Sequence, residues 1–210
     1  MGYVNQFKSS VLAITALVLV VASIFGFSLV LNAAQPEREP SLAELALKAD
    51  DLAGLPGVSD SVLRKSGPTS ADDVSQPLNT KNDLGSLTIA REFLFEYEEA
   101  YAVEAGAWDG QYAAYIGNYL YRYPDPTQAQ GIADQVIDAI LRYPGGHLIG
   151  LETQDGPISG RTAMFIGSEG DAIYWFVGTQ DNVLILLTVN GPSTSSTEEL
   201  FKALVTRALR

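Results

Sequence analysis

The chain has 210 residues, of which 47% are hydrophobic and 18% charged, so it has enough apolar material for one folded domain with a core. Its formal net charge of −12 predicts an acidic surface, which excludes nucleic acid and disfavours anionic lipid headgroups as partners. The chain has no cysteine, which excludes disulfides, thiolate metal sites, cysteine nucleophiles and a lipidated cysteine.

Residues 11–34 are a stretch of 24 residues without a charge. A helix of this length spans about 35 Å, more than the roughly 30 Å hydrocarbon core of a bilayer. We therefore predict a single transmembrane anchor, in contact with membrane lipid. Lys8 precedes it, which places residues 1–10 in the cytoplasm and the remaining chain outside, in the periplasm or at the cell surface. The alternative is cleavage as a secretory signal near Ala34, which gives a secreted protein.

Residues 35–86 are predicted to form a stem, a short helix and an irregular loop. The stem, QPEREP, is polar and contains two prolines. Ser41 and Glu44 fit a capping box at the start of the helix, and Gly54 follows its end. Residues 59–86 are rich in Ser, Asp, Thr, Pro and Asn and predict irregular structure.

Residues 87–210 predict the extracytoplasmic domain. Residues 87–98 alternate like a strand, although residues 92–104 can also be read as a helix. A second strand is predicted over 115–123. Asp125 as N-cap and Pro126 at the first helical position then begin an amphipathic helix of about 17 residues.

Three strands, 147–153, 161–166 and 172–178, follow with short turns between them, which predicts antiparallel neighbours. Residues 183–189, VLILLTV, are apolar on both faces and should lie in the middle of the sheet. A closing amphipathic helix begins near Ser195. The predicted fold class is α+β: an antiparallel β-sheet of about five strands with two amphipathic helices packed on one face, after one transmembrane helix.

This order of elements carries a resemblance to a known group. Over residues 117–209, the segments GNYLYRYPDPTQAQGIADQVIDAI, RTAMFIGSEGDAIYWFVGTQDNVLILLTVNG and EELFKALVTRAL resemble PsbP-like extracytoplasmic domains and the related mycobacterial lipoprotein and sensor domains. The resemblance implies a small non-catalytic module, tethered at a membrane, that binds a ligand or supports a larger membrane complex. No motif position matches a residue of known role. The lipoprotein relatives carry a lipidated cysteine, which a protein anchor would have to replace here.

Catalytic, cofactor and metal residues are not predicted anywhere in the chain. His147 is the only histidine and is most simply the first residue of a strand. Phosphate loops, dinucleotide fingerprints and zincin motifs are absent from the sequence. The paired carboxylates lack the calcium-loop pattern and are read as solvated acidic surface.

Aromatic residues supply the candidate interaction surface. Tyr119, Tyr121 and Tyr123 share one face of a strand, where the rings either fill the core or form a docking platform. Trp108 is predicted to lie in a glycine-flanked loop, where it either caps the core or contacts a partner.

The resulting function prediction is a membrane-anchored, non-catalytic interaction module that serves as an accessory or stabilising subunit of a membrane protein complex. Its partners would be other membrane protein subunits, and small residues such as Gly26 in the anchor suit close helix packing. The alternative is a small-ligand-binding or sensor domain of an exported protein.

Overall fold

The computed structural model describes residues 39–56, 58–69, 96–109, 112–143, 145–150, 158–166 and 170–208. The predicted span 11–34 and most of the predicted strand 87–98 lie outside these ranges. In the part of the chain that is described, we find no helix both long and apolar enough to cross a membrane.

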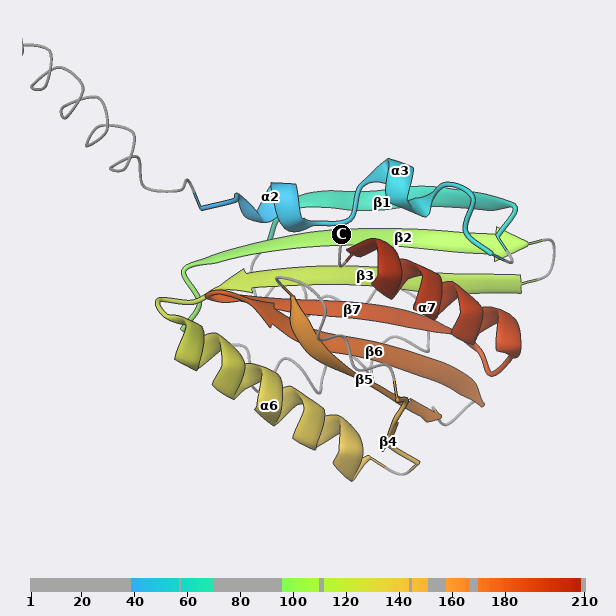
Figure 1. The fold of residues 1–210 in the computed structure, drawn as a ribbon. Coiled ribbons are helices and arrows are strands. Elements are labelled where there is room, and N and C mark those ends of the chain that lie inside the picture. Colours follow the sequence, from blue (N-terminus) through green and yellow to red (C-terminus); the bar gives the residue numbers. More distant parts are fainter. Residues whose placement is uncertain are drawn as a thin grey trace, which may run out of the picture. The chain divides into compact units, whose positions relative to one another are not determined.

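Within these ranges, seven antiparallel strands form one sheet, drawn in Figure 1. They are β1 (Asp60–Pro68), β2 (Glu99–Asp109), β3 (Tyr112–Arg122), β4 (His147–Leu148), β5 (Ser159–Ile166), β6 (Asp171–Gln180) and β7 (Val183–Pro192), in the spatial order β1-β2-β3-β7-β6-β5-β4. The sheet is wider than the five strands expected from sequence. The predicted antiparallel arrangement and the central place of β7 are confirmed.

The helices are α2 (Leu42–Leu45), α3 (Ala49–Leu52), α6 (Pro126–Arg142) and α7 (Ser195–Ala208). The start of α6 is as predicted, because the Asp125 carboxylate accepts a hydrogen bond from the Gln128 amide at 2.9 Å. The predicted helix after Ser41 is present only as the two single turns α2 and α3, whose backbone between them is extended.

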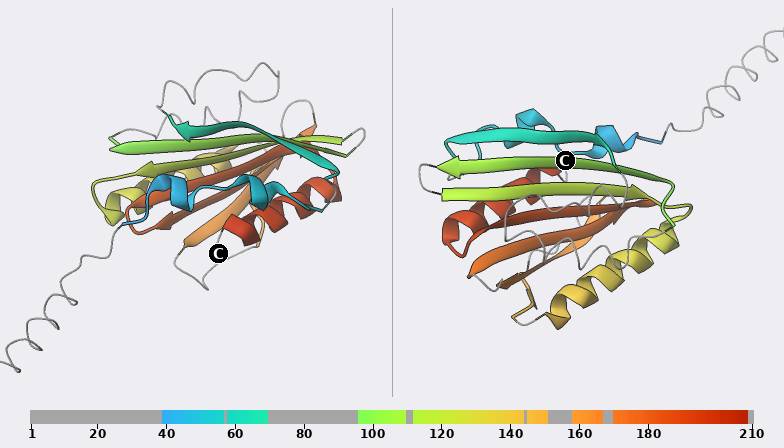
Figure 2. Two further views of the ribbon diagram at one scale, coloured as in Figure 1. Left: turned by 90° about the horizontal axis from the view of Figure 1, so that it is seen from above. Right: turned by 180° about the vertical axis from the view of Figure 1, so that it is seen from behind.

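The prediction that both long helices pack on one face of the sheet is wrong. One buried cluster joins α7, α2 and α3 to one face, here called the α7 face, and a second joins α6 to the other, the α6 face. The views in Figure 2 show the helices on the two sides. The physical reason lies in β6 and β7, which are buried along nearly their whole length, so an apolar layer must cover each of their faces.

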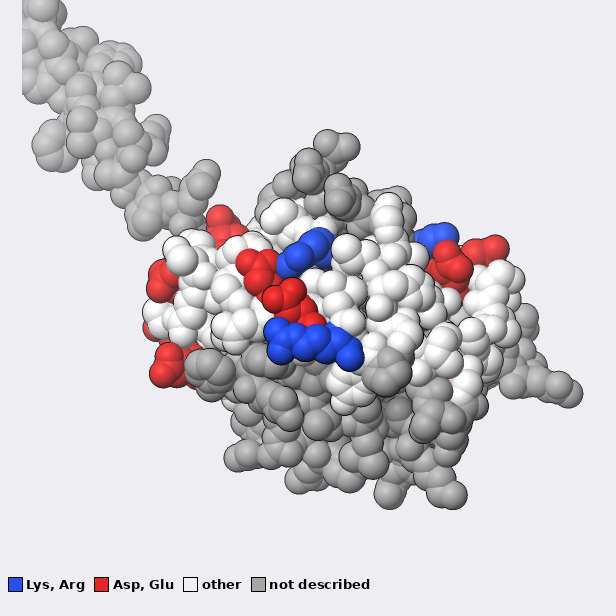
Figure 3. Space-filling model, turned by 90° about the horizontal axis from the view of Figure 1, so that it is seen from below, with Lys and Arg blue, Asp and Glu red and all other residues white. Residues whose placement is uncertain are grey.

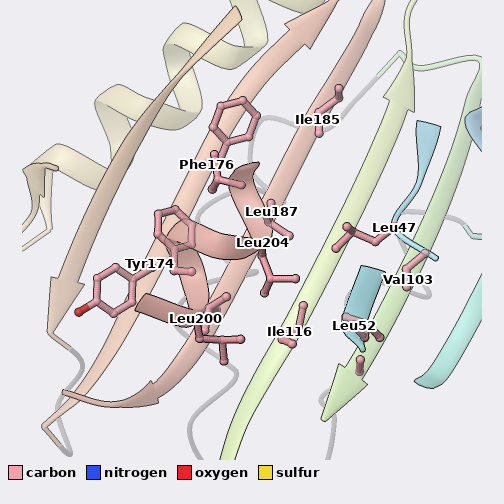
Figure 4. Close-up of a cluster of buried hydrophobic side chains, with 14 of the residues drawn as sticks. Leu47, Leu52, Val103, Ile116, Tyr174, Phe176, Ile185, Leu187, Leu200 and Leu204 are labelled. Atoms are coloured by element: carbon pink, nitrogen blue, oxygen red, sulfur yellow. The ribbon is translucent and has the colours of Figure 1, made fainter. Parts of the chain in front are cut away.

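The α7 face is an apolar core, shown in Figure 4. Leu200 and Leu204 of α7 lie over Tyr174 and Leu187 of the sheet. The N-terminal turns are tied to the same face by Asn118, whose side chain accepts from the Leu47 amide at 2.9 Å and donates to the Leu186 carbonyl at 3.3 Å. The segment after Ser41 is thus an integral part of the domain.

Arg207 holds the N-terminal turns to the other end of the chain. Near the end of α7, its guanidinium donates to the backbone carbonyls of Asp51, Ala53 and Gly54. Carbonyls that follow a helical turn lack an intrahelical donor, so a guanidinium with several N–H groups satisfies them well.

Two stretches predicted as irregular are strands. Residues 60–68 form β1, although the sequence predicted a loop over 59–86, because β1 pairs with β2 along its length despite its weak apolar alternation. Trp108 lies in β2 and not in a loop, and its backbone pairs with both β1 and β3. Pairing between strands distant in sequence outweighed local glycine and polar composition in both cases.

Candidate functional site

The three tyrosines predicted as a candidate interaction surface lie on the α6 face of β3. Tyr119, Tyr121 and Tyr123 each have 0% of their surface exposed, and they pack in the same cluster as the apolar stripe of α6. The structure therefore places these rings in the core, which is one of the two alternatives left open by the sequence.

Their hydroxyl groups occupy different environments. The Tyr119 hydroxyl lies 3.1 Å from that of Tyr115, within hydrogen-bond distance. The buried hydroxyls of Tyr121 and Tyr123 find no hydrogen-bond partner among the described residues. Burial raises the pKa of Tyr121 well above its usual value, and Tyr119 and Tyr97 raise it further. Tyr97 also contacts the Tyr121 ring edge to face, with the centroids 5.3 Å apart.

A row of polar residues crosses the middle of the same face. The strand register pairs Glu104 of β2 with Gly117 of β3, Gly117 with Thr188 of β7, and Thr188 with Trp175 of β6. Glu104, Thr188 and Trp175 are 6%, 3% and 0% exposed. The indole N–H of Trp175 has no hydrogen-bond partner in the described part of the chain. A buried row with a carboxylate, a hydroxyl and an unpaired donor is unusual in a sheet interior.

Gly117 allows two hydroxyls to lie over one backbone position. A Cβ atom at Gly117 would lie 2.9 Å from both the Tyr119 hydroxyl and the Thr188 hydroxyl, and 2.6 Å from the Tyr119 ring. The Thr188 hydroxyl also donates a long hydrogen bond, 3.5 Å, to the Gly117 carbonyl. Only glycine fits here, because any side chain would displace the Tyr119 ring.

More accessible side chains border this row. Gly106, the register partner of Tyr115, lies beneath the Trp108 ring and the Arg64 guanidinium, which would be 2.9 Å and 3.3 Å from a Cβ atom at that position. Arg64 is exposed, and Trp108 and Tyr115 are half-buried. We call these three the rim, and together with the buried floor they make up the polar cluster: Glu104, Tyr119, Thr188 and Trp175 as floor, Arg64, Trp108 and Tyr115 as rim.

Sequence reasoning found only part of this cluster. Trp108 and Tyr119 were singled out from the sequence, whereas Glu104, Thr188 and Trp175 were missed. A signal was present for two of them: Thr188 is the one polar residue within VLILLTV, and Glu104 interrupts an alanine-rich stretch. The register that aligns them could not be read from the sequence, because residues 104 and 188 fall in one row, on either side of Gly117, only through the order of β2, β3 and β7.

Other titratable groups are distributed over the surface. His147 is exposed at the start of β4, where its Nδ1 lies 2.9 Å from the Gly145 carbonyl. The described residues contain no group of three or more histidine, aspartate and glutamate side chains that could hold a metal ion. Acidic and basic side chains lie next to one another in Figure 3, and the ion pairs include Arg161 with Asp134.

Comparisons with known proteins leave the family open. No known protein family and no curated protein matches the chain. The extracellular domain of PknH from Mycobacterium tuberculosis is similar in structure, with a TM-score of 0.45 and 14% identity over 83% of this chain and 97% of that one. A protein of Mycobacterium smegmatis described as a putative uncharacterized Rv0999 ortholog has a TM-score of 0.43 and 12% identity, over 82% of this chain and 98% of its own. Both structures are of mycobacterial proteins, and the resemblance noted from the sequence also included mycobacterial proteins. Neither structure is described as a PsbP-like protein.

Proposed function

We propose that this protein is a non-catalytic, extracytoplasmic binding module whose domain holds a small polar ligand at the polar cluster on the α6 face. The observation that carries the proposal is the buried indole of Trp175, whose N–H has no partner among the described residues, in one row with the buried Thr188 and Glu104. Burial of an N–H without a hydrogen-bond partner costs about 1–3 kcal/mol, which a ligand that accepts from it would offset.

The opposite face of the same sheet provides the contrast. Its buried polar side chains are engaged in the fold: Asn118 bonds to two backbone groups, and the Thr162 hydroxyl donates to the Ile149 carbonyl at 3.1 Å. The Trp175 N–H, by contrast, has no hydrogen-bond partner in the described ranges. This difference supports a binding function for the α6 face in particular.

The membrane topology belongs to the same proposal. Residues 11–34 would anchor the protein in the bilayer as a single span, with residues 1–10 in the cytoplasm and the domain in the periplasm or at the cell surface. Mass spectrometry of the N-terminus of protein purified from its own membranes tests this topology. An intact segment 11–34 is expected, and a chain that begins after Ala34 would overturn the anchor.

Both tryptophans of the chain lie in the polar cluster, so their fluorescence reports on the site directly. We expect a member of a screening set of neutral, anionic and cationic metabolites to change this fluorescence and to raise the unfolding temperature of the full-length protein, because a ligand stabilises the state it binds. The Thr188→Val variant should lose this response. A set that produces no response, or a response unchanged in Thr188→Val, would contradict the proposal.

A second candidate function is that of an accessory subunit of a membrane protein complex. Three of the exposed large hydrophobic side chains lie in or beside the edge strands β4 and β5: Leu148 in β4, Ile166 at the end of β5, and Tyr143, which follows α6 and contacts Phe165, with 50%, 42% and 39% of their surfaces exposed. Exposed apolar side chains gathered at one edge are typical of protein contacts.

Purification of the full-length protein in mild detergent, with mass spectrometry of bound proteins, tests this second candidate. Stoichiometric membrane partners that are lost with Leu148→Asp but kept with Leu63→Asp would support it. Leu63 is the matched control, because it is 41% exposed on β1 at the opposite edge of the sheet. Purification of the protein alone would contradict it.

A further inference from the structure

We propose that the surface of strand β1 on the α6 face is a docking surface for a short acidic segment of another protein. The surface, here called the basic patch, consists of Arg64, Lys65 and Trp108. It is accessible, because Arg64 is exposed and the other two residues are half-buried. The inference goes beyond both candidate functions, since the patch lies outside the buried floor and at the opposite edge of the sheet from β4 and β5.

A bulge in β1 brings the two cations onto one face. The register of β1 and β2 shifts between Leu63 and Lys65, which leaves Arg64 as an extra residue. Consecutive side chains of a regular strand point to opposite faces. Here Arg64 lies over Gly106 on the α6 face. Lys65 is the register partner of Glu104 and shares that face, so the bulge makes two consecutive residues into neighbouring positive charges.

Gly106 provides a bare stretch of backbone beneath the patch. A Cβ atom at this position would lie 2.9 Å from the Trp108 ring and 3.3 Å from the Arg64 guanidinium. Glycine inside a strand lowers stability and marks a close approach of other groups to the backbone. The indole and the guanidinium both use this space, so an apolar contact and charge-assisted hydrogen bonds are offered at one place.

Both cations are available to a partner. Arg64 and Lys65 are the one pair of adjacent basic residues in the sequence, and in the described part of the chain neither forms an ion pair. The Lys65 ammonium donates to the Thr69 hydroxyl at 3.1 Å. Lys202, by contrast, is paired with Glu198 on α7. The basic patch therefore presents charges that the fold itself does not neutralise.

The carboxylates nearest to the patch in register leave it with a net positive charge. Glu104 lies level with Lys65 and offsets part of its charge, but it is only 6% exposed and offers a partner little to contact. Asp60 is exposed and lies four residues from Arg64 along β1. That separation is about 13 Å at the usual rise of a strand, more than the screening length of about 8 Å at physiological ionic strength.

The chemistry of the patch favours a short acidic segment with an apolar side chain. Carboxylates form strong, often bidentate hydrogen bonds with a guanidinium, and an apolar side chain beside them can pack on Trp108. Arginine and tryptophan are also enriched at the centres of protein interfaces. A long polyanion or an anionic membrane would contact the rest of the acidic domain as well, in a chain of net charge −12, and be repelled. A short segment contacts the patch alone.

The partner is expected to bind through side chains and not as an added strand. β1 is the terminal strand of the sheet in Figure 1. A bulge and charged side chains at an edge disfavour pairing with a further strand. Edge protection alone, however, requires neither a glycine beneath the cations nor an indole beside them. The arrangement of Gly106 and Trp108 is therefore the observation that favours recognition.

The test uses the full-length protein in nanodiscs of neutral phosphatidylcholine, so that the membrane adds no net charge. The probe is the peptide Glu-Glu-Phe-Glu-Glu, labelled with a neutral dye, and its neutral counterpart is Gln-Gln-Phe-Gln-Gln. Fluorescence anisotropy should show saturable binding of the acidic peptide and binding weaker by about tenfold or more for the neutral one. Added sodium chloride should weaken the acidic peptide, because the patch is exposed to solvent.

Three variants locate the binding. Arg64→Gln combined with Lys65→Gln should weaken the acidic peptide by about tenfold or more, since it removes both cations. Arg142→Gln is the matched control with unchanged affinity, because Arg142 is an exposed arginine at the end of α6, which packs on β5, β6 and β7. Thr188→Val should also bind the peptide normally, which separates the patch from the small-ligand proposal. Circular dichroism of each variant confirms that it folds.

The remaining outcomes overturn the inference without touching the small-ligand proposal. Equal binding of the acidic and neutral peptides, or no binding of either, excludes recognition of an acidic segment. Equal affinity in the double variant and in Arg142→Gln excludes the patch. Complete displacement of the peptide by inorganic phosphate, or by phosphatidylglycerol vesicles, at the same concentration of charge would identify a small-anion site or a lipid-binding surface instead of a protein-docking surface.

Discussion

The two faces of the sheet differ in how they treat buried polar groups. The α7 face carries an apolar core, and its buried polar side chain Asn118 bonds to two backbone groups. This face is therefore packed as an ordinary protein interior. On the α6 face, tyrosine hydroxyls and an indole N–H are buried without partners among the described residues, next to Glu104 and Thr188. One face of a sheet can thus maximise stability while the other gives up some of it, and the second is where a binding function is expected.

Removing a large aromatic side chain from the core on the α7 face should have the largest effect. Phe201 is fully buried and stacks on Tyr174 with the ring centroids 5.4 Å apart. Phe201→Ala should lower the free energy of unfolding by about 3–5 kcal/mol through lost burial and the cavity left behind. Urea unfolding measures this loss. Lys202→Ala, at the exposed neighbouring position, should change it by about 0.5 kcal/mol or less, and equal losses for both variants would contradict the core assignment.

Asn118→Ala should have the second-largest effect. It removes the acceptor for the buried Leu47 amide and the donor to the Leu186 carbonyl, which predicts a loss of about 2–3 kcal/mol. Amide hydrogen exchange provides the sharper measurement, because the Leu47 amide should lose its protection. A variant that is destabilised while the Leu47 amide stays protected would show that the N-terminal turns do not depend on this side chain.

Tyrosine-to-phenylalanine substitutions on β3 should change the free energy of unfolding by about 1 kcal/mol or less. Tyr119→Phe removes the contact with the Tyr115 hydroxyl and should destabilise by about 1 kcal/mol. Tyr121→Phe removes a buried hydroxyl without a partner and should be neutral or stabilising by up to about 1 kcal/mol. Chemical unfolding of both variants measures the difference. Equal losses would contradict the contrast between the two hydroxyls.

Raising the pH above about 10 should destabilise the protein through the buried tyrosines of the α6 face, whereas these tyrosines should not respond to pH near neutrality. Burial raises the pKa of Tyr121 and of Tyr123 above the value of about 10 expected in the unfolded chain. A raised pKa in the folded state means that the associated stability is fully present below about pH 10 and is lost as the pH rises further, because the unfolded chain then releases protons first. Unfolding experiments from pH 7 to 11 measure this loss, which should be smaller in Tyr121→Phe. A loss that begins well below pH 9 would contradict the assignment to tyrosine.

Much of the second half of the fold followed from local pattern. The Asp125–Pro126 start, the apolar stripe of α6, the doubly apolar β7 and the amphipathic α7 all formed where predicted, because capping chemistry and periodicity are properties of a few neighbouring residues. The strand β1 was missed, since its pairing partner β2 lies about forty residues away in a segment whose own pattern was ambiguous.

The sequence by itself determined the fold class, the central place of β7, the boundaries of α6 and the absence of cysteine chemistry, because these depend on residue types and short periods. Only the tertiary structure decided that α6 and α7 lie on opposite faces, that the β3 tyrosines are buried, and that Glu104, Thr188 and Trp175 stand in one row. Those properties depend on strand order and register, which join residues far apart in the chain and leave no local trace.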